Sequence, residues 1–375
     1  MSATGASREA AVAQAAHDAL VALYPSQRSV FDRELAQVLN GVPANKGRAL
    51  GISIGAAAAA NILAARANDG SVQANTPIFP GTSNPPLPGE HQSDPLHPTH
   101  GLLTPGWGAV TTFSGIDVTA PGVRIPPPPA LTSAAYASAF DDVRTLGGDG
   151  IITPTVRTPE QTDIGIFWAY DGTIGLGTPP VLYNEIVRVL AKQEKNTPIE
   201  NARLFALANI AMADAGIGCW DSKYFYNFWR PVIGQRNSGI DGNPATNAPA
   251  NWTPLGAPAS NQTPGGDFTP PFPAYSSGHA TFGAALFRTL ASFYGTDALP
   301  FQLKSDELRG FTTDSAGRHR RTVVRRFARF SDAAAENGRS RIFLGIHWQF
   351  DADAGIDQGN LIADTVFATL LTPLP

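Results

Sequence analysis

The chain has 375 residues, of which 43% are hydrophobic and only 15% charged, so its composition excludes an intrinsically disordered protein and predicts a globular one. Its net charge of −4 gives no basic excess, which argues against nucleic acid or an anionic membrane surface as a partner. The single cysteine, Cys219, excludes an intrachain disulfide and a metal cluster held by thiolates.

The N-terminal region predicts helices that each end at a proline or a glycine-containing turn, over residues 7–24, 28–41 and 45–68. The first residues lack a basic stretch followed by an apolar one, so no signal peptide is visible. We expect a soluble protein whose location stays open, either cytoplasmic or exported with its leader already removed. The most apolar run, residues 50–65, is short and weakly hydrophobic, which favours a buried helix over a membrane span.

A long irregular segment rich in proline, glycine, serine and threonine follows, from Thr76 to about Pro129. Such a segment inside a compact chain is either a linker or an ordered functional loop. Its three histidines, His91, His97 and His100, do not have the spacing of a common metal site. We therefore expect solvated or rim positions for them.

Helical patterns resume after this segment and are interrupted by one more irregular stretch, residues 232–276. The expected helices cover residues 131–147, 158–171, 179–194, 198–230 and 277–294, further segments up to 337, and 350–371. Strand-like alternation is nearly absent, so the sequence predicts an all-α protein of helical bundles with two long ordered loops. The basic run at residues 318–326 is short and precedes a helix, and we expect it to be solvated or to line an interface.

The segment Ser340–Asp351 contains His347 and Asp351 four residues apart, with Arg341 nearby. On a helix this spacing lets the carboxylate hold the imidazole in one tautomer, which prepares a nucleophilic or metal-ligating histidine. A guanidinium in an otherwise apolar segment indicates a partly desolvated site for a multiply charged oxyanion. Taken alone, the same residues would also fit an ordinary structural pair.

Lys223 and Arg230 are seven residues apart, so both lie on one stripe of the predicted helix. A cationic stripe is usually a solvated face. Aromatic residues fill the sequence between these two, from Tyr224 to Trp229, and cations among so many rings are less often idle surface charges.

Ser277, Gly278 and His279 are expected at the N-terminus of the helix that follows them. Free backbone N–H groups, a hydroxyl and a glycine that allows close approach make such a terminus an anion site, and His279 would lie beside the anion as an acid or base. The alternative is an ordinary N-cap with an unrelated histidine. Together the three segments predict a site for a tetrahedral oxyanion with both a ligand and an acid or base.

These residues also carry a family resemblance. The three-part pattern is similar to the signature of the type 2 phosphatidic acid phosphatase and vanadium haloperoxidase superfamily: Lys223-x6-Arg230-Pro231, Ser277-Gly278-His279 and Ser340-Arg341-x5-His347-x3-Asp351. The sequences around it, WDSKYFYNFWRP, PFPAYSSGHATF and SRIFLGIHWQFDADAG, most resemble soluble vanadium-dependent haloperoxidases. The resemblance implies one haloperoxidase-like helical domain over residues 1–375, with an N-terminal four-helix bundle over about 7–194 and a site-bearing one over about 198–375.

The resemblance further implies vanadate as the cofactor, with phosphate able to occupy the same site. The residues expected to hold vanadate are Lys223, Arg230, Ser277, Gly278, His279, Arg341 and His347. His347 would be the axial vanadium ligand, tuned by Asp351, and His279 would move protons as peroxide replaces vanadate oxygens. The resulting peroxovanadate would oxidise a halide to a hypohalous species.

Three more positions take an expected role from the resemblance. Phe272 stands where chloride-oxidising relatives carry Phe and bromide-oxidising ones more often His, and it is expected to line the substrate or halide pocket with Trp229. Asp163 is expected to support the arginine side of the site. Ser276 departs from the signature, which usually has proline there, and this change would loosen the anion cradle.

The partners implied by the resemblance are hydrogen peroxide, a halide and a small organic acceptor, and the expected assembly is a homodimer. The site residues leave open a soluble acid phosphatase that uses the same pocket, with His347 as nucleophile and a phosphohistidine intermediate. They also leave open an anion-binding or scaffolding protein without catalysis. Halide preference and the natural organic substrate are not predicted.

Overall fold

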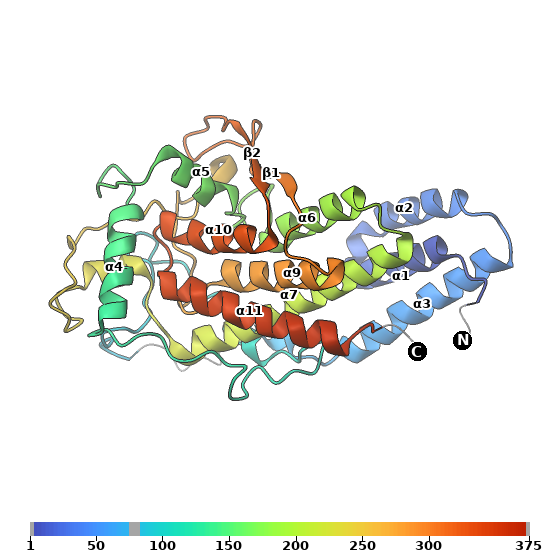
Figure 1. Cartoon of the computed structure of the whole chain (residues 1–375), viewed down its shortest axis with the longest axis horizontal. Helices are drawn as coiled ribbons and strands as arrows, with labels where there is room; N and C mark the ends of the chain where they lie inside the picture. Colours follow the sequence, from blue (N-terminus) through green and yellow to red (C-terminus); the bar gives the residue numbers. More distant parts are fainter. Residues whose placement is uncertain (1–3, 75–82, 373–375) are drawn as a thin grey trace. The chain divides into compact units, whose positions relative to one another are not determined.

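The computed structural model describes residues 4–74 and 83–372, and most of these residues are helical, as predicted (Figure 1). The chain divides into two compact units. The first comprises the residues up to Ser71 together with Lys195–Arg203, and the second comprises Val72–Glu194 and the residues from Leu204 onward.

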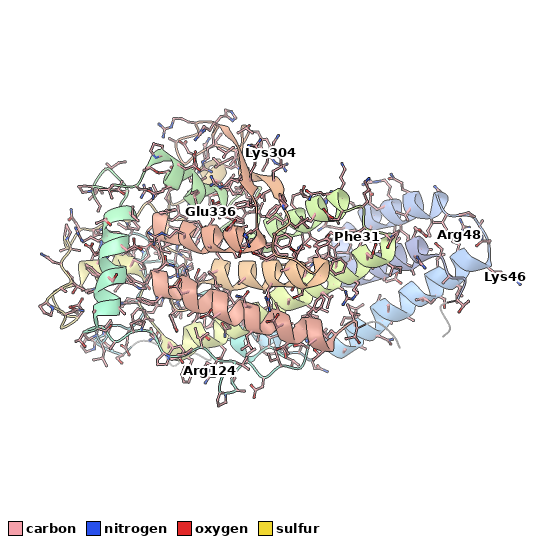
Figure 2. All side chains as sticks on the ribbon, viewed as in Figure 1. Phe31, Lys46, Arg48, Arg124, Lys304 and Glu336 are labelled. Atoms are coloured by element: carbon pink, nitrogen blue, oxygen red, sulfur yellow. The ribbon has the colours of Figure 1, made fainter. Side chains whose placement is uncertain are left out.

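The first unit contains the three helices expected at the N-terminus, namely α1 (Arg8–Leu23), α2 (Arg28–Asn40) and α3 (Lys46–Arg66). Side chains cap two of them, since Ser7 Oγ accepts the N–H of Ala10 at 3.2 Å and Asn45 Oδ1 accepts the N–H of Arg48 at 3.1 Å. Arg48 also donates from Nη1 to the carbonyl of Leu39 at 3.3 Å, which ties the start of α3 to the end of α2 (Figure 2).

Two helices are long and apolar enough to cross a membrane by length and composition alone, α3 and α7 (Pro198–Tyr226). The apolar window of α7 is 61% buried, as expected for a core helix, whereas that of α3 is 17% buried. The lack of a membrane span stays a prediction for α3.

The second unit contains most of α7 and the remaining helices, which are α4 (Ala134–Leu146), α5 (Pro159–Phe167), α6 (Pro179–Gln193), α8 (Pro231–Arg236), α9 (Gly278–Tyr294), α10 (Phe330–Phe343) and α11 (Gln349–Thr369). Helix α9 packs against both α10 and α11 (Figure 1). Two apolar cores each include residues of α9, namely Leu286 and Phe287 in one and Ala280 in the other. The N-terminus of α9 is therefore fixed in the interior of this unit.

Glycines on α11 allow it to approach α9 closely. A Cβ at Gly359 would lie 2.3 Å from the backbone oxygen of Thr281, and one at Gly355 would lie 2.9 Å from that of Ser277. No side chain fits at these distances, so glycine at both positions lets the backbones meet. This close packing brings the first turn of α11, with Asp351, next to the first turn of α9.

The prediction of helical segments between residues 295 and 337 was wrong in part. This region forms an antiparallel pair of strands, β1 (Phe301–Arg309) and β2 (Thr322–Phe327), in which Phe301 pairs with Phe327. The first five residues of β1 alternate between buried and exposed positions, which is the period of a strand packed on one face. The basic run therefore lies in and before β2, and not directly before a helix.

The chain passes from the second unit to the first at Lys195 and returns to the second unit at Leu204. The division into bundles over about 7–194 and 198–375 stays a prediction. Helices α4, α5 and α6 belong to the same unit as α9, α10 and α11. The assignment of residues 1–375 to one haloperoxidase-like domain stays a prediction.

Candidate functional site

The connection between α10 and α11 carries the predicted histidine. His347 precedes the first residue of α11, Gln349, so it does not lie on the helix as the spacing suggested, and Asp351 lies in the first turn. Asp351 Oδ2 accepts hydrogen bonds from Nδ1–H of His347 at 2.8 Å and from the N–H of Trp348 at 2.9 Å. The carboxylate orients the ring as predicted, but from a helix N-terminus and not along a helix face.

These hydrogen bonds fix the tautomer of His347. Because Nδ1 carries the proton donated to Asp351, Nε2 keeps a lone pair, and Nη1 of Arg230 lies 2.9 Å from it. Burial lowers the pKa of His347 well below its ordinary value. The positive charges that lower it further include those of Arg230, Lys223 and Arg341. Burial also raises the pKa of Asp351 to about 7. The imidazole is therefore neutral at pH 7, and the lone pair of its Nε2 accepts a hydrogen bond from Arg230.

Two arginines contribute buried donors to this region. Arg230 donates from Nε to the carbonyl of Phe272 at 2.8 Å and from Nη1 to that of Ile346 at 2.7 Å. Arg341 donates from Nη2 to both carboxylate oxygens of Asp171, at 2.8 and 2.9 Å. Within the described residues, Nη2 of Arg230 and both Nε and Nη1 of Arg341 are buried without a hydrogen-bond partner.

The N-terminus of α9 has the expected residues in the expected order. Ser277 is the N-cap, but its side chain makes no cap hydrogen bond, and its buried Oγ has no partner among the described residues. Gly278 and His279 follow as the first two helical residues, where backbone N–H groups lack intrahelical acceptors. Nε2 of His279 donates to the carbonyl of Ala169 at 2.5 Å, so the tautomer leaves Nδ1 free of a proton. Burial lowers the pKa of His279 to about 4, and the charge of Arg341 lowers it further.

Lys223 is completely buried, but its ammonium group is already occupied. Nζ donates to the carbonyls of Pro273 at 3.0 Å, Ala274 at 3.1 Å and Ser276. Burial lowers the pKa of Lys223 to about 7. The expected donation from Lys223 to an oxyanion stays a prediction, and it requires at least one of these carbonyl contacts to be exchanged.

The unpartnered atoms test which ligand the site fits. Four buried donors lack a protein partner within the described residues: Nη2 of Arg230, Nε and Nη1 of Arg341, and Oγ of Ser277. Leaving such a donor unpaired costs about 1–3 kcal/mol, and more for a charged one. A tetrahedral oxyanion offers acceptors to all of them, and a bare cation offers none. The described residues contain no group of three or more His, Cys, Asp or Glu that could hold a metal ion by itself.

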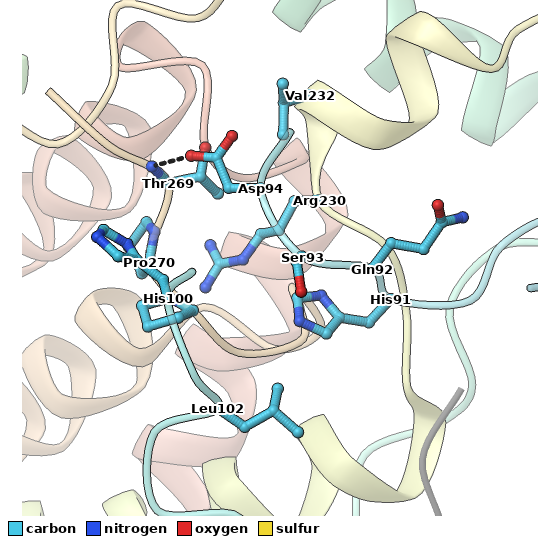
Figure 3. A pocket seen from close by; sticks show the side chains of 11 residues that line it. His91, Gln92, Ser93, Asp94, His100, Leu102, Arg230, Val232, Thr269 and Pro270 are labelled. Carbon is cyan, nitrogen blue, oxygen red and sulfur yellow. Dashed lines mark hydrogen bonds between the residues drawn. The ribbon is translucent and has the colours of Figure 1, made fainter. Parts of the chain in front are cut away.

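A pocket lies beside Arg230, which lines it (Figure 3). Its lining comes from residues 91–102 and 269–271 together with α8 and its N-cap: His91, Gln92, Ser93, Asp94, His100, Leu102, Arg230, Val232, Thr269, Pro270 and Pro271. Asp94 Oδ2 accepts the N–H of Thr269 at 3.0 Å, and His97 donates from Nε2 to the carbonyl of Gly265 at 2.8 Å. These bonds fix one irregular segment to the other, so at this point the first segment is an ordered loop.

The expectation of solvated or rim positions was wrong for His91, which is 5% exposed. Its backbone N–H donates to the carbonyl of Asn227 at 2.8 Å, which draws the residue inward next to α7. Burial lowers the pKa of His91 to about 3, and the charges of Arg230 and Lys223 lower it further. His91 therefore contributes a neutral imidazole close to the cations of the site.

The sequence of the second irregular segment and the helices around it matches a known family. Residues 203–374 match the family model of the VCPO second helical-bundle domain. This part of the chain is therefore similar to a VCPO second helical-bundle domain. Over 268 residues the chain is 42% identical to the vanadium chloroperoxidase of Curvularia inaequalis, which is 61% of this chain and 43% of that protein. The chain thus matches less than half of that relative's length.

Solved structures show the same fold over nearly the whole chain. A bacterial vanadium-dependent iodoperoxidase superposes with a TM-score of 0.72 at 24% identity, over 95% of this chain and 79% of that one. The apo form of a bacterial vanadium-dependent chloroperoxidase gives 0.70 at 15% identity, over 96% and 82%. The predicted resemblance to vanadium haloperoxidases and the predicted all-α fold are confirmed.

The two aromatic residues expected in a halide pocket lie in different surroundings. The ring of Phe272 is 4.9 Å from Nζ of Lys223 and 4.8 Å from Cζ of Arg230, directly after the pocket residue Pro271. Trp229 is completely buried in an aromatic core, and its carbonyl accepts Nε1–H of Trp348 at 3.0 Å. The role of both in halide binding stays a prediction.

The carboxylate that supports the arginine side of the site is not Asp163. Asp163 pairs with Arg321, whereas Arg341 pairs with Asp171. The helix expected over residues 158–171 ends at Phe167, and the chain after it turns inward towards Arg341. The glycine after Asp171, Gly172, has a φ of 81° and was a turn signal that could have placed Asp171 in a loop.

Proposed function

We propose that the chain is a vanadium-dependent haloperoxidase, which oxidises a halide with hydrogen peroxide at a vanadate held around His347. The observation that carries this proposal is the set of four buried, unpartnered donors on Arg230, Arg341 and Ser277. They are paired when an oxyanion binds, and the matched family supplies vanadate as the oxyanion of its named members. Phosphate has the same shape and charge pattern and is expected to compete for the site.

His347 is proposed as the vanadium ligand through Nε2. The hydrogen bond from Nδ1 to Asp351 keeps the proton away from Nε2 and makes that nitrogen more basic. Arg230, which donates to Nε2 in the vanadate-free protein, would turn to the oxygens of the bound anion. The first backbone N–H groups of α9, at Gly278 and His279, complete the cradle.

When bound, vanadate supplies a Lewis-acid centre that activates hydrogen peroxide towards a halide, so that peroxide, halide and one proton give hypohalous acid and water. The chain moves the proton. His279 is neutral at pH 7, and its Nδ1 is free to accept a proton from incoming peroxide and to return it to the departing water. Peroxide, halide and an organic acceptor would approach through the pocket beside Arg230 (Figure 3).

The proposal is tested by loading the protein with vanadate, adding peroxide and bromide, iodide or chloride, and following halogenation of a dye. We expect turnover, its loss in His347→Ala, and inhibition by phosphate. Turnover with chloride would support the proposed role of Phe272. If the vanadate-loaded protein is inactive and the vanadate-free protein hydrolyses a phosphomonoester, the acid phosphatase alternative replaces the proposal. If neither reaction occurs, the chain is an anion-binding protein.

We also propose that the chain forms a homodimer, as the family resemblance implies. Light scattering after size exclusion tests this directly, because the mass of one chain is 39.5 kDa. A mass near that value at every concentration measured would contradict the dimer and would leave the proposed reaction unaffected.

A further inference from the structure

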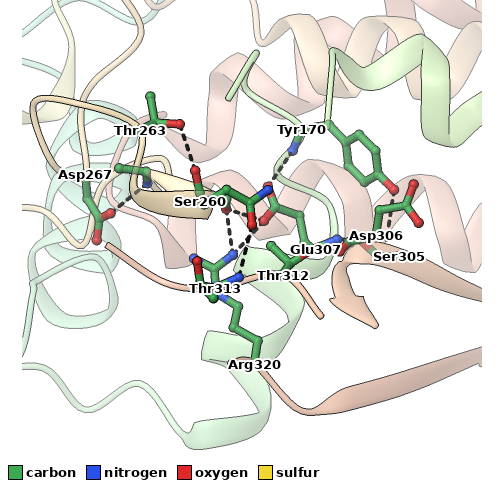
Figure 4. Close-up of polar contacts among 12 residues, drawn as sticks. Tyr170, Ser260, Thr263, Asp267, Ser305, Asp306, Glu307, Thr312, Thr313 and Arg320 are labelled. Atoms are coloured by element: carbon green, nitrogen blue, oxygen red, sulfur yellow. Dashed lines mark hydrogen bonds and ion pairs between the residues drawn. The ribbon is translucent and has the colours of Figure 1, made fainter. Parts of the chain in front are cut away.

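We infer that Glu307 is a positioning residue for the anion site, a role that rests on the proposed function. Arg320 and Ser260 hold Glu307, which accepts the backbone N–H of Tyr170 (Figure 4). Tyr170 is the centre of the turn Ala169–Asp171, and this turn orients His279 and Arg341. Glu307 itself touches neither the anion nor a reacting atom.

Glu307 lies on β1 and is completely buried, yet its carboxylate has a full set of partners. Oε2 accepts hydrogen bonds from Oγ of Ser260 and from Nη1 of Arg320, the latter at 2.6 Å. Nη1 of Arg320 also lies 2.6 Å from Oγ of Ser260. Oε1 remains available and accepts the backbone N–H of Tyr170 at 3.4 Å. The buried ion pair thus ends on the backbone of another segment.

That segment is the turn after α5, and each of its residues contacts something different. The carbonyl of Ala169 accepts Nε2–H of His279 at 2.5 Å. The hydroxyl of Tyr170 accepts the N–H of Asp306 at 2.8 Å. Both carboxylate oxygens of Asp171 accept from Arg341, at 2.8 and 2.9 Å. One turn therefore touches β1 in the middle and the two site residues on either side.

The turn needs support, because its central residue has an unfavourable backbone. Tyr170 has a φ of 49°, a left-handed conformation that costs a bulky side chain energy unless its surroundings enforce it. Its N–H bond to Glu307 and its hydroxyl bond from Asp306 both come from β1. The strand pair that the sequence did not predict thus holds the turn that orients His279 and Arg341.

A bystander ion pair would behave differently from a positioning one. Burial raises the pKa of Glu307 to about 7, which means that the protein interior disfavours the charged form of this carboxyl group. Glu307→Gln keeps the size of the side chain but removes its charge, and it leaves one acceptor oxygen for the three donors from Ser260, Arg320 and the backbone of Tyr170. Arg318→Gln is the matched control, because Arg318 pairs with Asp314 at 2.8 Å in the link between the same two strands and is 81% exposed.

The first test measures the dissociation constant of vanadate for the metal-free protein by calorimetry. Mutation of a residue that orients the groups binding a ligand typically lowers affinity by about 10–100-fold. We therefore expect the Kd of vanadate to rise about tenfold in Glu307→Gln and to change by less than about twofold in Arg318→Gln. Ser260→Ala removes one donor to the carboxylate without changing charge, and it should weaken binding by a smaller factor, about threefold. If Glu307→Gln does not fold, Ser260→Ala decides the question against the same control.

The second test follows the imidazole resonances, which is practical because the chain has seven histidines. Glu307→Gln should shift the signals of His279, because its partner Ala169 lies in the turn. It should not change the signals of His347, because Asp351 orients that ring from α11. Equal Kd values and unmoved His279 signals in Glu307→Gln or Ser260→Ala would overturn the inference. If the wild-type protein itself binds no vanadate, the proposed function fails instead, and the two failures are distinct.

Discussion

The cations on the α7–α8 side of the site and the cation on α10 have partners of different kinds. Lys223 and Arg230 are held by backbone carbonyls, which carry no net charge. Arg341 is held by the carboxylate of Asp171. On the first side, no carboxylate among the described residues pairs directly with either cation, whereas the cation on the second side is neutralised before any ligand arrives.

This difference separates charge from orientation. Burial lowers the pKa of Arg230 to about 9 and that of Lys223 to about 7, and the charge of Asp351 offsets this only in part. Both groups are therefore disfavoured in their charged forms until an anion binds. The charge of Arg341 is balanced by Asp171, and two of its N–H donors remain unpartnered among the described residues. Arg341 would therefore orient a bound anion through hydrogen bonds more than it would attract one by its charge. We therefore expect the α7–α8 side to dominate anion affinity and the α10 side to dominate folding stability.

The largest effect on stability is expected at the neutralised side. Arg341→Met leaves Asp171 buried and unpaired, which should lower the free energy of unfolding by about 3–5 kcal/mol. Chemical denaturation of the vanadate-free protein measures this loss. Adding Asp171→Asn to this variant removes the unpaired carboxylate charge and should restore much of the stability. It should not restore vanadate binding. If the Arg341→Met single variant is as stable as the wild-type protein, the Arg341–Asp171 pair does not stabilise the fold.

The second prediction concerns Arg230, on the α7–α8 side, where we expect a small loss of stability and a large loss of anion affinity. Arg230→Met removes a charged donor whose partners are neutral carbonyls, so the unfolding free energy should fall by only about 1–2 kcal/mol. Vanadate affinity should fall about a hundredfold, because charge-assisted bonds to an anion contribute about 1.5–3 kcal/mol each. Calorimetric titration and denaturation of the same sample give both numbers. A larger loss of stability than in Arg341→Met would reverse the comparison.

The sequence predicted the site residues that belong to local motifs and missed those that reach it from loops. His347, Asp351 and Ser277 could be found because each motif lies within a few residues of a helix start, where hydrogen-bonding rules are local. Asp171 is 170 residues from Arg341 in the chain, and His91 lies in a proline-rich segment without periodicity. No pattern of spacing reports such a pairing.

The fold shows the same limit. The predicted bounds of α9 and α11 lie within a few residues of their observed ends. The strands β1 and β2 were missed because their alternation is short and basic residues interrupt it, so the surrounding helical patterns dominated the interpretation. Tertiary packing of β1 on α5 and α6 decides this region, and a single sequence does not display that packing.

The smallest expected effect concerns the protonation of Lys223, and a pH titration of anion affinity tests its direction. Its folded pKa is about 7, below the ordinary value of 10.5, so anion binding below pH 7 meets a lysine that is already charged. Above pH 7 the lysine must take up a proton on binding, and affinity should fall by up to about tenfold per pH unit. Molybdate suits the titration between pH 7 and 9, because its own charge does not change there.

Stability without the anion should move the other way over the same range. The unfolded chain keeps the Lys223 proton up to its ordinary pKa and the folded chain does not, so unfolding takes up a proton and stability rises with pH. Lys223→Met should flatten both slopes relative to the wild-type protein. If the wild-type affinity for molybdate is constant from pH 7 to 9, Lys223 does not bind the anion, and its ammonium group only ties together the carbonyls of Pro273, Ala274 and Ser276.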